Sequence, residues 1–384
     1  MRILVVTTEL HQEGSGGGGI YVYEMCKELV RQGHDVEVIT SLEPRIRVIP
    51  GWESRSPFKI HDITLNKKPI IGALAWSIKA CLLSSRLIRT KRYGVVSVQS
   101  PFCHMYPVLY CGKVPLIATV QGGFGLGNPR HSLLRRVFHF LRDLASFMRA
   151  STIIVLNHST RHELARWGIS QEKIAYVPNG VEWERFVERS EGCRLRKSFR
   201  IPKDAIVVLY LGRIDPSKGV EMLLDAVQMI AKIRSDIWTM VAGDGPLLPR
   251  LAKNYAHQDN VVFTGFLSQA DKTELYKESD LFVFPSQGGE GMPTVLLEAM
   301  ASGLPIISTR VAGAVEIVEN GFGRLVPCGD ATQLAEAILE LTRDRERLRT
   351  MGFCARKCAE RYDWSIVVQH MLVVFETASR SKLG

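Results

Sequence analysis

Two glutamates, Glu290 and Glu298, are separated by seven residues, and the stretch between them opens with Gly-Met-Pro and continues with apolar residues. Pro293 suits the first turn of a helix over residues 294–301. Backbone amides near residues 292–295 would then face a negatively charged group. Glu298 would lie within about two turns of the helix start, where its carboxylate can accept both hydroxyls of a ribose, while Glu290 can accept a sugar hydroxyl. Two solvated glutamates are the alternative interpretation.

Two cations follow a predicted strand in the sequence LGRIDPSKG, residues 211–219. Arg213 offers a planar fork of donors and Lys218 a point charge, a combination that suits a diphosphate. Each residue alone would be interpreted as a surface cation. Their joint position at the carboxyl end of a strand favours an anion site.

A glycine run, EGSGGGG, occupies residues 13–19, and Gly14, Gly16 and Gly19 satisfy G-x-G-x-x-G. A nicotinamide site would need the first glycine directly after the strand and an acidic residue at the end of the second strand. Neither condition holds, because the second strand ends at Thr40. Bare amides before a helix N-terminus still attract an anion. A flexible loop without a ligand is the alternative.

Short apolar runs alternate with helix-compatible segments along the whole chain, which predicts parallel sheets. The chain has 384 residues, more than one core usually serves, so two doubly wound α/β domains joined near residues 180–200 are expected. Ligands of such sheets bind at the carboxyl ends of the strands. The predicted strands lie at 2–8, 35–40, 95–100, 115–120, 151–157, 205–212, 238–245, 261–265, 281–286, 305–309 and 324–327.

The net charge of +10 lies entirely in the first half of the chain. Residues 1–190 hold 25 basic and 15 acidic residues, and the remaining residues hold 49 − 25 = 24 basic and 39 − 15 = 24 acidic ones. Residues 63–142 contain twelve basic residues and no acidic one. A solvated surface normally mixes both signs, so this region is expected to meet an anionic surface.

Two segments of this basic region, residues 75–92 and 132–150, have amphipathic helical patterns. Contact with anionic lipid is one interpretation. The other is that both apolar stripes face the core of the first domain, which suits the stripes better but leaves the missing acidic residues unexplained. The stripe of the second segment comprises Leu134, Val137, Phe138, Leu141, Leu144, Ala145 and Met148.

Other classes of protein fit the sequence less well. The N-terminal apolar run is too short for a signal peptide, and the longest apolar stretch, residues 69–83, is interrupted by Lys79, so a cytoplasmic protein is expected, peripheral at the inner face of the membrane. No nucleic-acid partner is expected, because the basic region lacks interleaved aromatic residues.

A series of motifs resembles the retaining glycosyltransferases of family 4, which have the GT-B fold. The motif E-x7-E is followed by A-M-A-x-G-x-P, and further matches span nearly the whole chain. Their order and spacing carry the resemblance. They are R-x-G-H-D-V (31–36), V-P-N-G-V-E (177–182), G-R-I-D-x-S-K-G (212–219), G-D-G-P (243–246), F-T-G-F (263–266) and G-x-G-R-L-V (321–326).

The resemblance implies two facing Rossmann-like domains. Residues 1–190 would form the acceptor-binding domain and residues 191–362 the nucleotide-sugar-binding domain. Residues 363–384 would form a C-terminal helix that crosses back onto the first domain. The donor would be a nucleotide-diphosphate sugar, and neither a metal nor another cofactor is implied, in agreement with the absence of a D-x-D motif.

The same resemblance implies a role for each candidate site residue. Arg213 and Lys218 would hold the diphosphate, Glu298 the ribose, and Glu290 a hydroxyl of the donor sugar. Phe266 and Leu267 would border the base. The backbone would complete the phosphate cradle at Gly16, Gly17, Gly18 and Gly19 and at Pro293, Thr294 and Val295.

The chain departs from the family at two histidine positions. Gln121 stands where the family commonly has the histidine of T-x-H, and S-V-Q (97–99) replaces H-x-H. A retaining transfer on one face of the sugar needs no side-chain base, because the leaving phosphate takes the acceptor's proton. Gln121 can hydrogen-bond the donor but cannot carry a proton. His104 is a candidate substitute, although a structural histidine is the simpler interpretation.

Three functions therefore stay open. The favoured one is retaining transfer of a hexose or N-acetylhexosamine to an acceptor hydroxyl that is lipid-linked or phosphate-bearing. A sugar phosphorylase or synthase on the same fold is the second. The third is a nucleotide-sugar-binding protein without turnover, which Gln121 makes plausible.

Overall fold

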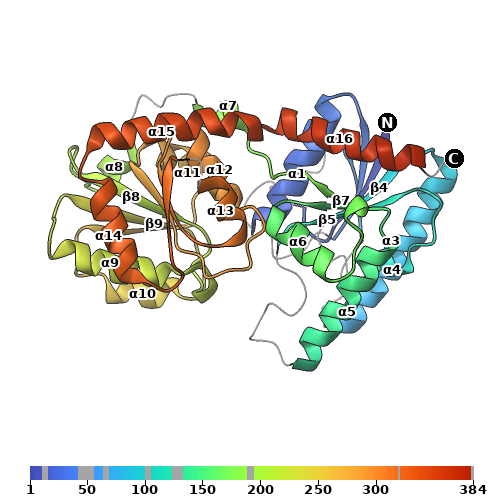
Figure 1. The fold of residues 1–384 in the computed structure, drawn as a ribbon, viewed down its shortest axis with the longest axis horizontal. Helices are drawn as coiled ribbons and strands as arrows, with labels where there is room; N and C mark the ends of the chain where they lie inside the picture. The colour runs from blue at the N-terminus through green and yellow to red at the C-terminus, as the bar shows by residue number, and fades with distance from the viewer. Residues whose placement is uncertain are drawn as a thin grey trace. The chain divides into compact units, whose positions relative to one another are not determined.

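The computed structural model describes residues 1–10, 16–41, 56–63, 69–99, 105–122, 133–187, 194–318 and 321–381. The chain divides into two compact α/β units (Figure 1). The first unit comprises Met1–Asn179 and Trp364–Gly384, and the second comprises Gly180–Asp363. Both units contain a parallel sheet with helices, as the predicted fold class requires.

The first unit is built on a seven-stranded sheet with the order β3-β2-β1-β4-β5-β6-β7. The order reverses between β1 and β4, which makes this the topological switch point of the sheet. Its strands are β1 (Arg2–Val6), β2 (Asp35–Thr40), β3 (Lys59–Asp62), β4 (Val95–Gln99), β5 (Leu116–Val120), β6 (Thr152–Val155) and β7 (Ile174–Tyr176). Its helices are α1 (Gly16–Arg31), α3 (Pro69–Thr90), α4 (Tyr106–Leu109), α5 (Leu133–Arg149), α6 (His158–Arg166) and α16 (Trp364–Ser381).

The C-terminal helix α16 packs against α1 and β4 of the first unit (Figure 1). Trp364, at its start, contacts the buried ring of Tyr21 edge to face, with the ring centroids 5.2 Å apart. The Gln32 side chain also donates to the Ser365 carbonyl at 2.9 Å. The last helix thus completes the core of the unit that contains the N-terminus.

The second unit is built on a six-stranded parallel sheet with the order β10-β9-β8-β11-β12-β13, whose switch point lies between β8 and β11. Its strands are β8 (Ile206–Leu211), β9 (Ile237–Ala242), β10 (Val261–Gly265), β11 (Leu281–Phe284), β12 (Ile306–Thr309) and β13 (Gly323–Val326). Its helices are α7 (Trp183–Val187), α8 (Arg194–Ser198), α9 (Val220–Ala231), α10 (Leu248–Asn254), α11 (Gln269–Lys277), α12 (Thr294–Ala301), α13 (Ala312–Val318), α14 (Ala331–Leu341) and α15 (Arg345–Ala359).

The boundary between the units lies eleven residues before the predicted one, at 179/180 instead of 190/191. The reason is a set of contacts with the end of the second unit. Val181 forms a parallel bridge with Asp363, and the Trp183 amide donates to the Asp363 carboxylate at 3.2 Å. The Trp183 indole also donates to the Arg356 carbonyl at 3.3 Å. Residues 180–187 therefore belong with the second sheet.

One face of the first sheet carries α3, α4 and α5 (Figure 1). Trp76 of α3 packs in a cluster with Leu4 and Val96, and Phe147 of α5 packs in a cluster with Ala118. Cross-strand pairing connects these strand residues, and α4 contacts both helices. No helix in the described part of the chain is long and apolar enough to cross a membrane.

The expectation that the apolar stripe of α5 faces the core is wrong for three of its described members, while Leu144 does pack against the core. Val137, Leu141 and Met148 are exposed, and Leu144 and Ala145 are half-buried. The inward face instead carries Arg142, Asp143, Ser146 and Phe147, all buried. The physical reason is a buried ion pair, in which the Arg142 guanidinium donates to the Asp143 carboxylate at 2.6 and 2.9 Å. The side chains of Leu134 and Phe138 lie outside the described residues.

Candidate functional site

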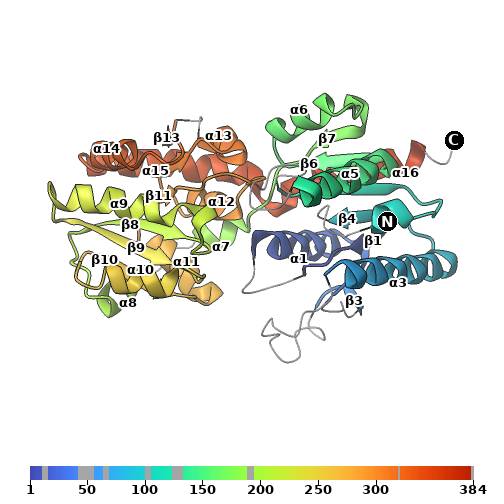
Figure 2. The ribbon, with the colours of Figure 1, turned by 90° about the horizontal axis from the view of Figure 1, so that it is seen from below.

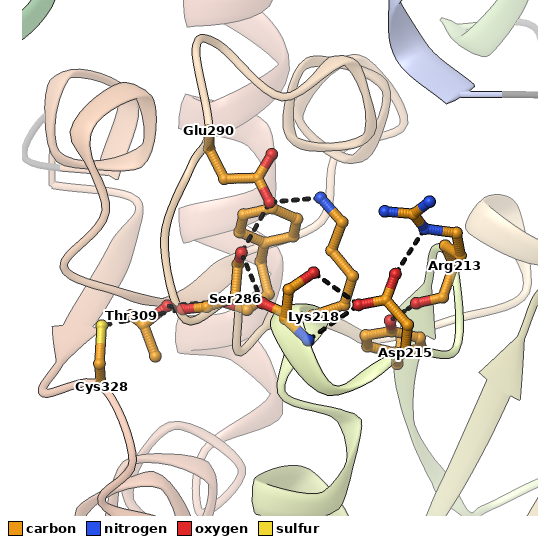
Figure 3. A network of polar contacts seen from close by, with 10 residues as sticks. Arg213, Asp215, Lys218, Ser286, Glu290, Thr309 and Cys328 are labelled. Atoms are coloured by element: carbon orange, nitrogen blue, oxygen red, sulfur yellow. Dashed lines mark hydrogen bonds and ion pairs between the residues drawn. The ribbon is translucent and has the colours of Figure 1, made fainter. Parts of the chain in front are cut away.

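The switch point of the second sheet brings together two loops that are about seventy residues apart in the chain. Strand β8 pairs in parallel with β11, so both strands end at the same edge of the sheet. The loop after β8 carries Arg213 and Lys218, and the loop after β11 carries Ser286 and Glu290. Figure 3 shows these side chains converging from the two loops. The sequence predicted both loops as site loops, and the structure places them side by side.

Asp215 organises the loop after β8. Its carboxylate accepts from the Ser217 amide at 2.8 Å and from the Ser217 hydroxyl at 2.5 Å, and thereby caps the short 3-10 turn Pro216–Lys218. It also pairs with the Arg213 guanidinium at 2.5 Å. Burial raises the pKa of Asp215, but the Ser217 hydrogen bonds and the nearby cations outweigh that effect, so the pKa lies below its ordinary value. The carboxylate stays charged and holds the exposed Arg213 in place.

Gly219 allows the two loops to touch. Its φ is +66°, and a Cβ at this position would lie 1.9 Å from the Pro285 carbonyl oxygen. The contact is extended by the Gln287 amide, which donates to the Ser217 carbonyl at 2.9 Å. Any side chain at position 219 would both strain the backbone and separate the loops.

Lys218 and Glu290 form an ion pair across the two loops, with Nζ 2.6 Å from Oε1 (Figure 3). The Ser286 hydroxyl donates to the same oxygen at 2.6 Å. Ser286 is fully buried, and its carbonyl accepts from the Thr309 hydroxyl at 2.5 Å and from the Cys328 thiol at 3.8 Å. The carboxylate is therefore fixed from the core of the sheet, while Lys218 reaches it from the neighbouring loop.

Glu298 lies in different surroundings from Glu290. Its side chain is 4% exposed, its Oε1 accepts from Lys272 Nζ at 2.5 Å, and its Oε2 accepts from the Tyr276 hydroxyl at 2.9 Å. Burial first, and then the Glu298 charge, raise the pKa of Tyr276 well above its ordinary value, so this hydroxyl remains a donor. Each carboxylate oxygen retains a second acceptor site. Its assignment to a ribose stays a prediction.

Helix α12 has the predicted bounds, with Pro293 at the N-cap position and Thr294 and Val295 half-buried in its first turn. The start of α13 packs closely against the loop that precedes α12. A Cβ on Gly313 would lie 2.0 Å from the Gly291 carbonyl oxygen. The first turn of α12 carries no acidic residue, so its partial positive charge is not offset there.

Phe266 and Leu267 follow β10, the edge strand of the second sheet. Phe266 is 60% exposed and Leu267 is half-buried. The following helix, α11, is capped by Ser268, whose hydroxyl accepts from the Asp271 amide at 3.2 Å. The same helix contains Lys272, which donates to Glu298. Helix α11 therefore connects the loop predicted to border the base with the residue predicted to bind the ribose.

In the first unit, Gly16–Gly19 form the first turn of α1, whereas the glycine run was expected to precede the helix. Residues 13–15 lie outside the described part. Gly18 is closely approached, since a Cβ there would lie 2.9 Å from both Gln121 Oε1 and Glu9 Oε2. Four consecutive glycines thus let other side chains reach the helix start.

Gln121 lies beside Gln99, which also stands where the family has a histidine. Its Nε2 donates to Gln99 Oε1 at 3.3 Å, and Gln99 Nε2 donates in turn to the Ser97 hydroxyl at 2.8 Å. Gln99 is fully buried, and its amide also lies 3.5 Å from the Met25 sulfur. Both departures from the family therefore form one neutral hydrogen-bonded chain. His104 lies outside the described residues.

Sequence reasoning missed several residues that position these groups. Lys272 and Tyr276 are four residues apart on α11 and so share one face. Asp215 directly precedes Pro216, which is a recognisable cap before a turn. Ser286 and Glu9 carried no signal of their own in the sequence, and Gln99 was marked only as a replacement for a family histidine.

The two halves of the chain match two protein-family models. Residues 15–185 match the model described as Glycosyltransferase Family 4, and residues 194–357 match the model described as Glycosyl transferases group 1.

Curated relatives match over nearly the full chain. The chain is 32% identical over 372 residues to a phosphatidyl-myo-inositol mannosyltransferase of Mycolicibacterium smegmatis, covering 95% of this chain and 91% of the relative. It is 26% identical over 384 residues to the N-acetyl-alpha-D-glucosaminyl L-malate synthase of Bacillus anthracis, covering 96% of each. Among solved structures, Anabaena Alr3699/HepE in complex with UDP has a TM-score of 0.78 at 19% identity, covering 98% of this chain and 100% of that chain.

Proposed function

Since the chain belongs to the family 4 glycosyltransferases with the GT-B fold, we propose that it moves a hexose or N-acetylhexosamine from a nucleotide-diphosphate sugar to an acceptor hydroxyl with retention of configuration. The acceptor is lipid-linked or phosphate-bearing. The reaction takes place in the cytoplasm, with the protein peripheral at the inner face of the membrane.

The observation that carries the proposal is the meeting of Arg213, Lys218 and Glu290 at the switch point of the second sheet. A diphosphate placed there would receive the fork of Arg213 and the point charge of Lys218. It would compete with Glu290 for Lys218. Glu290, still held by the Ser286 hydroxyl at 2.6 Å, would then be available to a hydroxyl of the donor sugar. The solved structure that contains UDP supports a nucleotide-sugar donor.

The transfer step needs no side-chain base in this scheme. The acceptor oxygen forms a bond to the anomeric carbon on the face from which the diphosphate leaves, the bond between that carbon and the diphosphate oxygen breaks, and the acceptor's proton passes to the departing diphosphate. Gln121 hydrogen-bonds the donor and orients it, because an amide neither gives up nor takes a proton at neutral pH. Developing negative charge on the leaving group is stabilised by Arg213 and Lys218.

The proposed reaction is independent of metal ions. The charge compensation that a divalent cation could provide would come from Arg213 and Lys218 and from the first turn of α12. No group of three or more His, Cys, Asp or Glu side chains within the described ranges could hold a metal ion. Activity in the presence of EDTA is the test of this part of the proposal.

The acceptor is proposed from charge and from the names of relatives. Residues 63–142 contain twelve basic and no acidic residues, which suits an anionic acceptor or the membrane that presents it. One relative is named for phosphatidyl-myo-inositol and another for L-malate, and both molecules are anionic.

The experiment measures nucleotide release from a panel of UDP-, GDP- and ADP-sugars, with and without a lipid extract and with and without EDTA. Release from one donor that EDTA leaves unchanged and lipid enhances would support the whole proposal. Release that requires inorganic phosphate, a sugar phosphate or a free sugar would favour a phosphorylase or synthase. Binding of a donor without any turnover would favour a sugar-nucleotide-binding protein, for which Gln121 is the relevant departure.

A further inference from the structure

Helix α5 presents Val137, Leu141 and Met148 to solvent, while two charged side chains and Phe147 lie on its inward face. Leu141 is 56% exposed and Met148 is 65% exposed, while the Arg142 and Asp143 side chains are at most 7% exposed. A helix that only packs on its own sheet shows the opposite arrangement. Large apolar side chains gathered on an outward face indicate a contact with something other than water.

Helix α3 has a second outward apolar row. Leu74, Ile78 and Leu82 follow each other at four-residue spacing and are 44%, 45% and 68% exposed. The next position in the row is Arg86, which is also exposed. The inward face of the helix is occupied by Trp76 and other buried residues of the core, so the row is not a misplaced core stripe.

Both rows lie on the same side of the first unit. The inward residues of α3 and of α5 pack on strand residues that are cross-strand partners on one face of the sheet, and α4 contacts both helices (Figures 1 and 2). The outward rows of the two helices therefore point away from the same sheet face. One extended partner surface can therefore contact both rows at once.

The charge around the rows selects the kind of surface. Lys79, Arg86 and Arg89 of α3 are exposed, and no acidic residue occurs in residues 63–142. A second copy of the chain would bring this basic surface against itself, because a two-fold interface pairs the same patch on both copies. A surface with apolar depth and negative headgroups complements both features.

We propose that the outward face of α3 and α5, formed by Leu74, Ile78, Leu82, Val137, Leu141 and Met148 and called here the α3–α5 face, docks on a bilayer of anionic phospholipid. The apolar side chains enter the boundary between headgroups and acyl chains, and the α3 cations pair with phosphates. This inference deepens the proposed function and rests on it, because the membrane would present the acceptor.

The test measures sedimentation of the full chain with vesicles of phosphatidylglycerol and phosphatidylcholine, or of phosphatidylcholine alone, without a sugar nucleotide. Leu82→Glu and Met148→Glu are compared with Ile233→Glu and Val373→Glu, whose native side chains are equally exposed, at 68% and 65% respectively, but lie elsewhere. We expect the first two variants to weaken binding to the anionic vesicles by about tenfold or more, and the matched controls to bind within about twofold of the unmodified chain.

The double variant Arg86→Gln/Arg89→Gln gives a second measurement that leaves the apolar rows intact. It should weaken binding, and added salt should weaken binding of the unmodified chain more than that of the variant. Equal binding to both vesicle types, or anionic binding that neither the glutamate nor the glutamine variants reduce, would overturn the proposal. A dimer that Leu82→Glu dissociates, with no vesicle binding by the unmodified chain, would also overturn it and assign the face to a second copy. Donor turnover is assayed separately with the lipid extract dispersed in detergent, without vesicles, so its absence would count against the proposed function alone.

Discussion

The switch points of the two sheets differ in how they use charge. In the second unit, Lys218 and Glu290 pair at 2.6 Å, and Asp215 holds Arg213 beside them. At the first unit's switch point the described groups are mostly neutral, namely glycine backbone and the amides of Gln121 and Gln99, with Glu9 as the charged side chain that approaches Gly18. The same architecture thus supports one site built from fixed charges and another built from neutral hydrogen-bonding groups.

This difference fits two tasks of the proposed reaction. Fixed cations next to fixed carboxylates suit the binding of a diphosphate, whose charge must be compensated before and during departure. Neutral amides and bare helix turns suit the orientation of uncharged hydroxyls. The first unit keeps a buried charge cluster too, but at Glu37, toward the β3 edge of its sheet and not at a strand end. The following predictions sharpen or break this contrast, from the largest expected effect to the smallest.

Lys272→Met should lower the free energy of unfolding by about 3–5 kcal/mol, because it leaves the buried Glu298 carboxylate without its cation. Urea-induced unfolding followed by circular dichroism measures the change. Lys272→Arg should recover part of the loss, and Lys232→Met, at an exposed position, serves as the control. A variant as stable as the unmodified chain would show that the second unit does not depend on its buried charges.

Lys218→Met and Glu290→Gln should each lower kcat/KM for donor turnover by about 10²–10³-fold, because preorganised charge at the diphosphate and the sugar is removed. Steady-state kinetics with the donor that the panel of sugar nucleotides identifies measures the effect, and Lys253→Met, at an exposed position of α10, is the control. A loss of less than tenfold in both variants would contradict the placement of the reaction at this switch point.

Glu37→Gln should flatten the acid limb of the stability curve. Burial raises the pKa of Glu37, but hydrogen bonds from Lys91, His61 and Tyr93 outweigh it and lower the pKa from 4.5 to about 2. The folded state therefore favours the charged form, and the stabilisation is present above pH 4.5 and lost as the pH falls from there toward 2. Its size is on the order of 3 kcal/mol.

Urea unfolding at several pH values between 7 and 3 checks this prediction. The Glu37→Gln variant should lose less stability over the acid part of this range than the unmodified chain does. Parallel curves for the two proteins would show that Glu37 is not the group responsible.

Gln121→Ala should lower kcat/KM by less than about tenfold, because only a neutral hydrogen bond is lost. The pH dependence of kcat should not change, since the amide carries no proton. Steady-state kinetics over a range of pH measures both quantities. A hundredfold loss, or a shifted pH profile, would mean that the neutral site takes part in proton transfer after all.

Much of the fold could be predicted because buried parallel strands appear as short apolar runs bounded by turns. Strand β3, with the sequence KIHD, was missed because it is a short edge strand whose residues are only half-buried or exposed. The start of α1 was placed too late because four glycines in a row are typical of loops, yet here they form the first helical turn. The orientation of α5 was wrong because the buried Arg142–Asp143 pair reverses the usual pattern.

The candidate site was predictable only to the level of its loops. Arg213, Lys218 and Glu290 follow strands that are adjacent in the sheet. Their position after predicted strands was therefore enough to predict that their loops lie at one edge of the sheet. Their partners were not predictable, because the ion pairs of Lys218 with Glu290 and of Lys272 with Glu298 join residues 72 and 26 positions apart. Such contacts depend on sheet order and helix packing, which local patterns do not encode.

The bridge between Val181 and Asp363 has a consequence for the modular construction of the chain. The second unit is one uninterrupted segment, residues 180–363, whose two ends already lie next to each other, with the Val181 amide 2.8 Å from the Tyr362 carbonyl. In the order of the chain, the second unit is an insertion between Asn179 and Trp364 of the first unit. One continuous stretch of coding sequence over this segment encodes every strand of the second sheet, both site loops and the pairs Lys218–Glu290 and Lys272–Glu298, so neither junction interrupts a sheet.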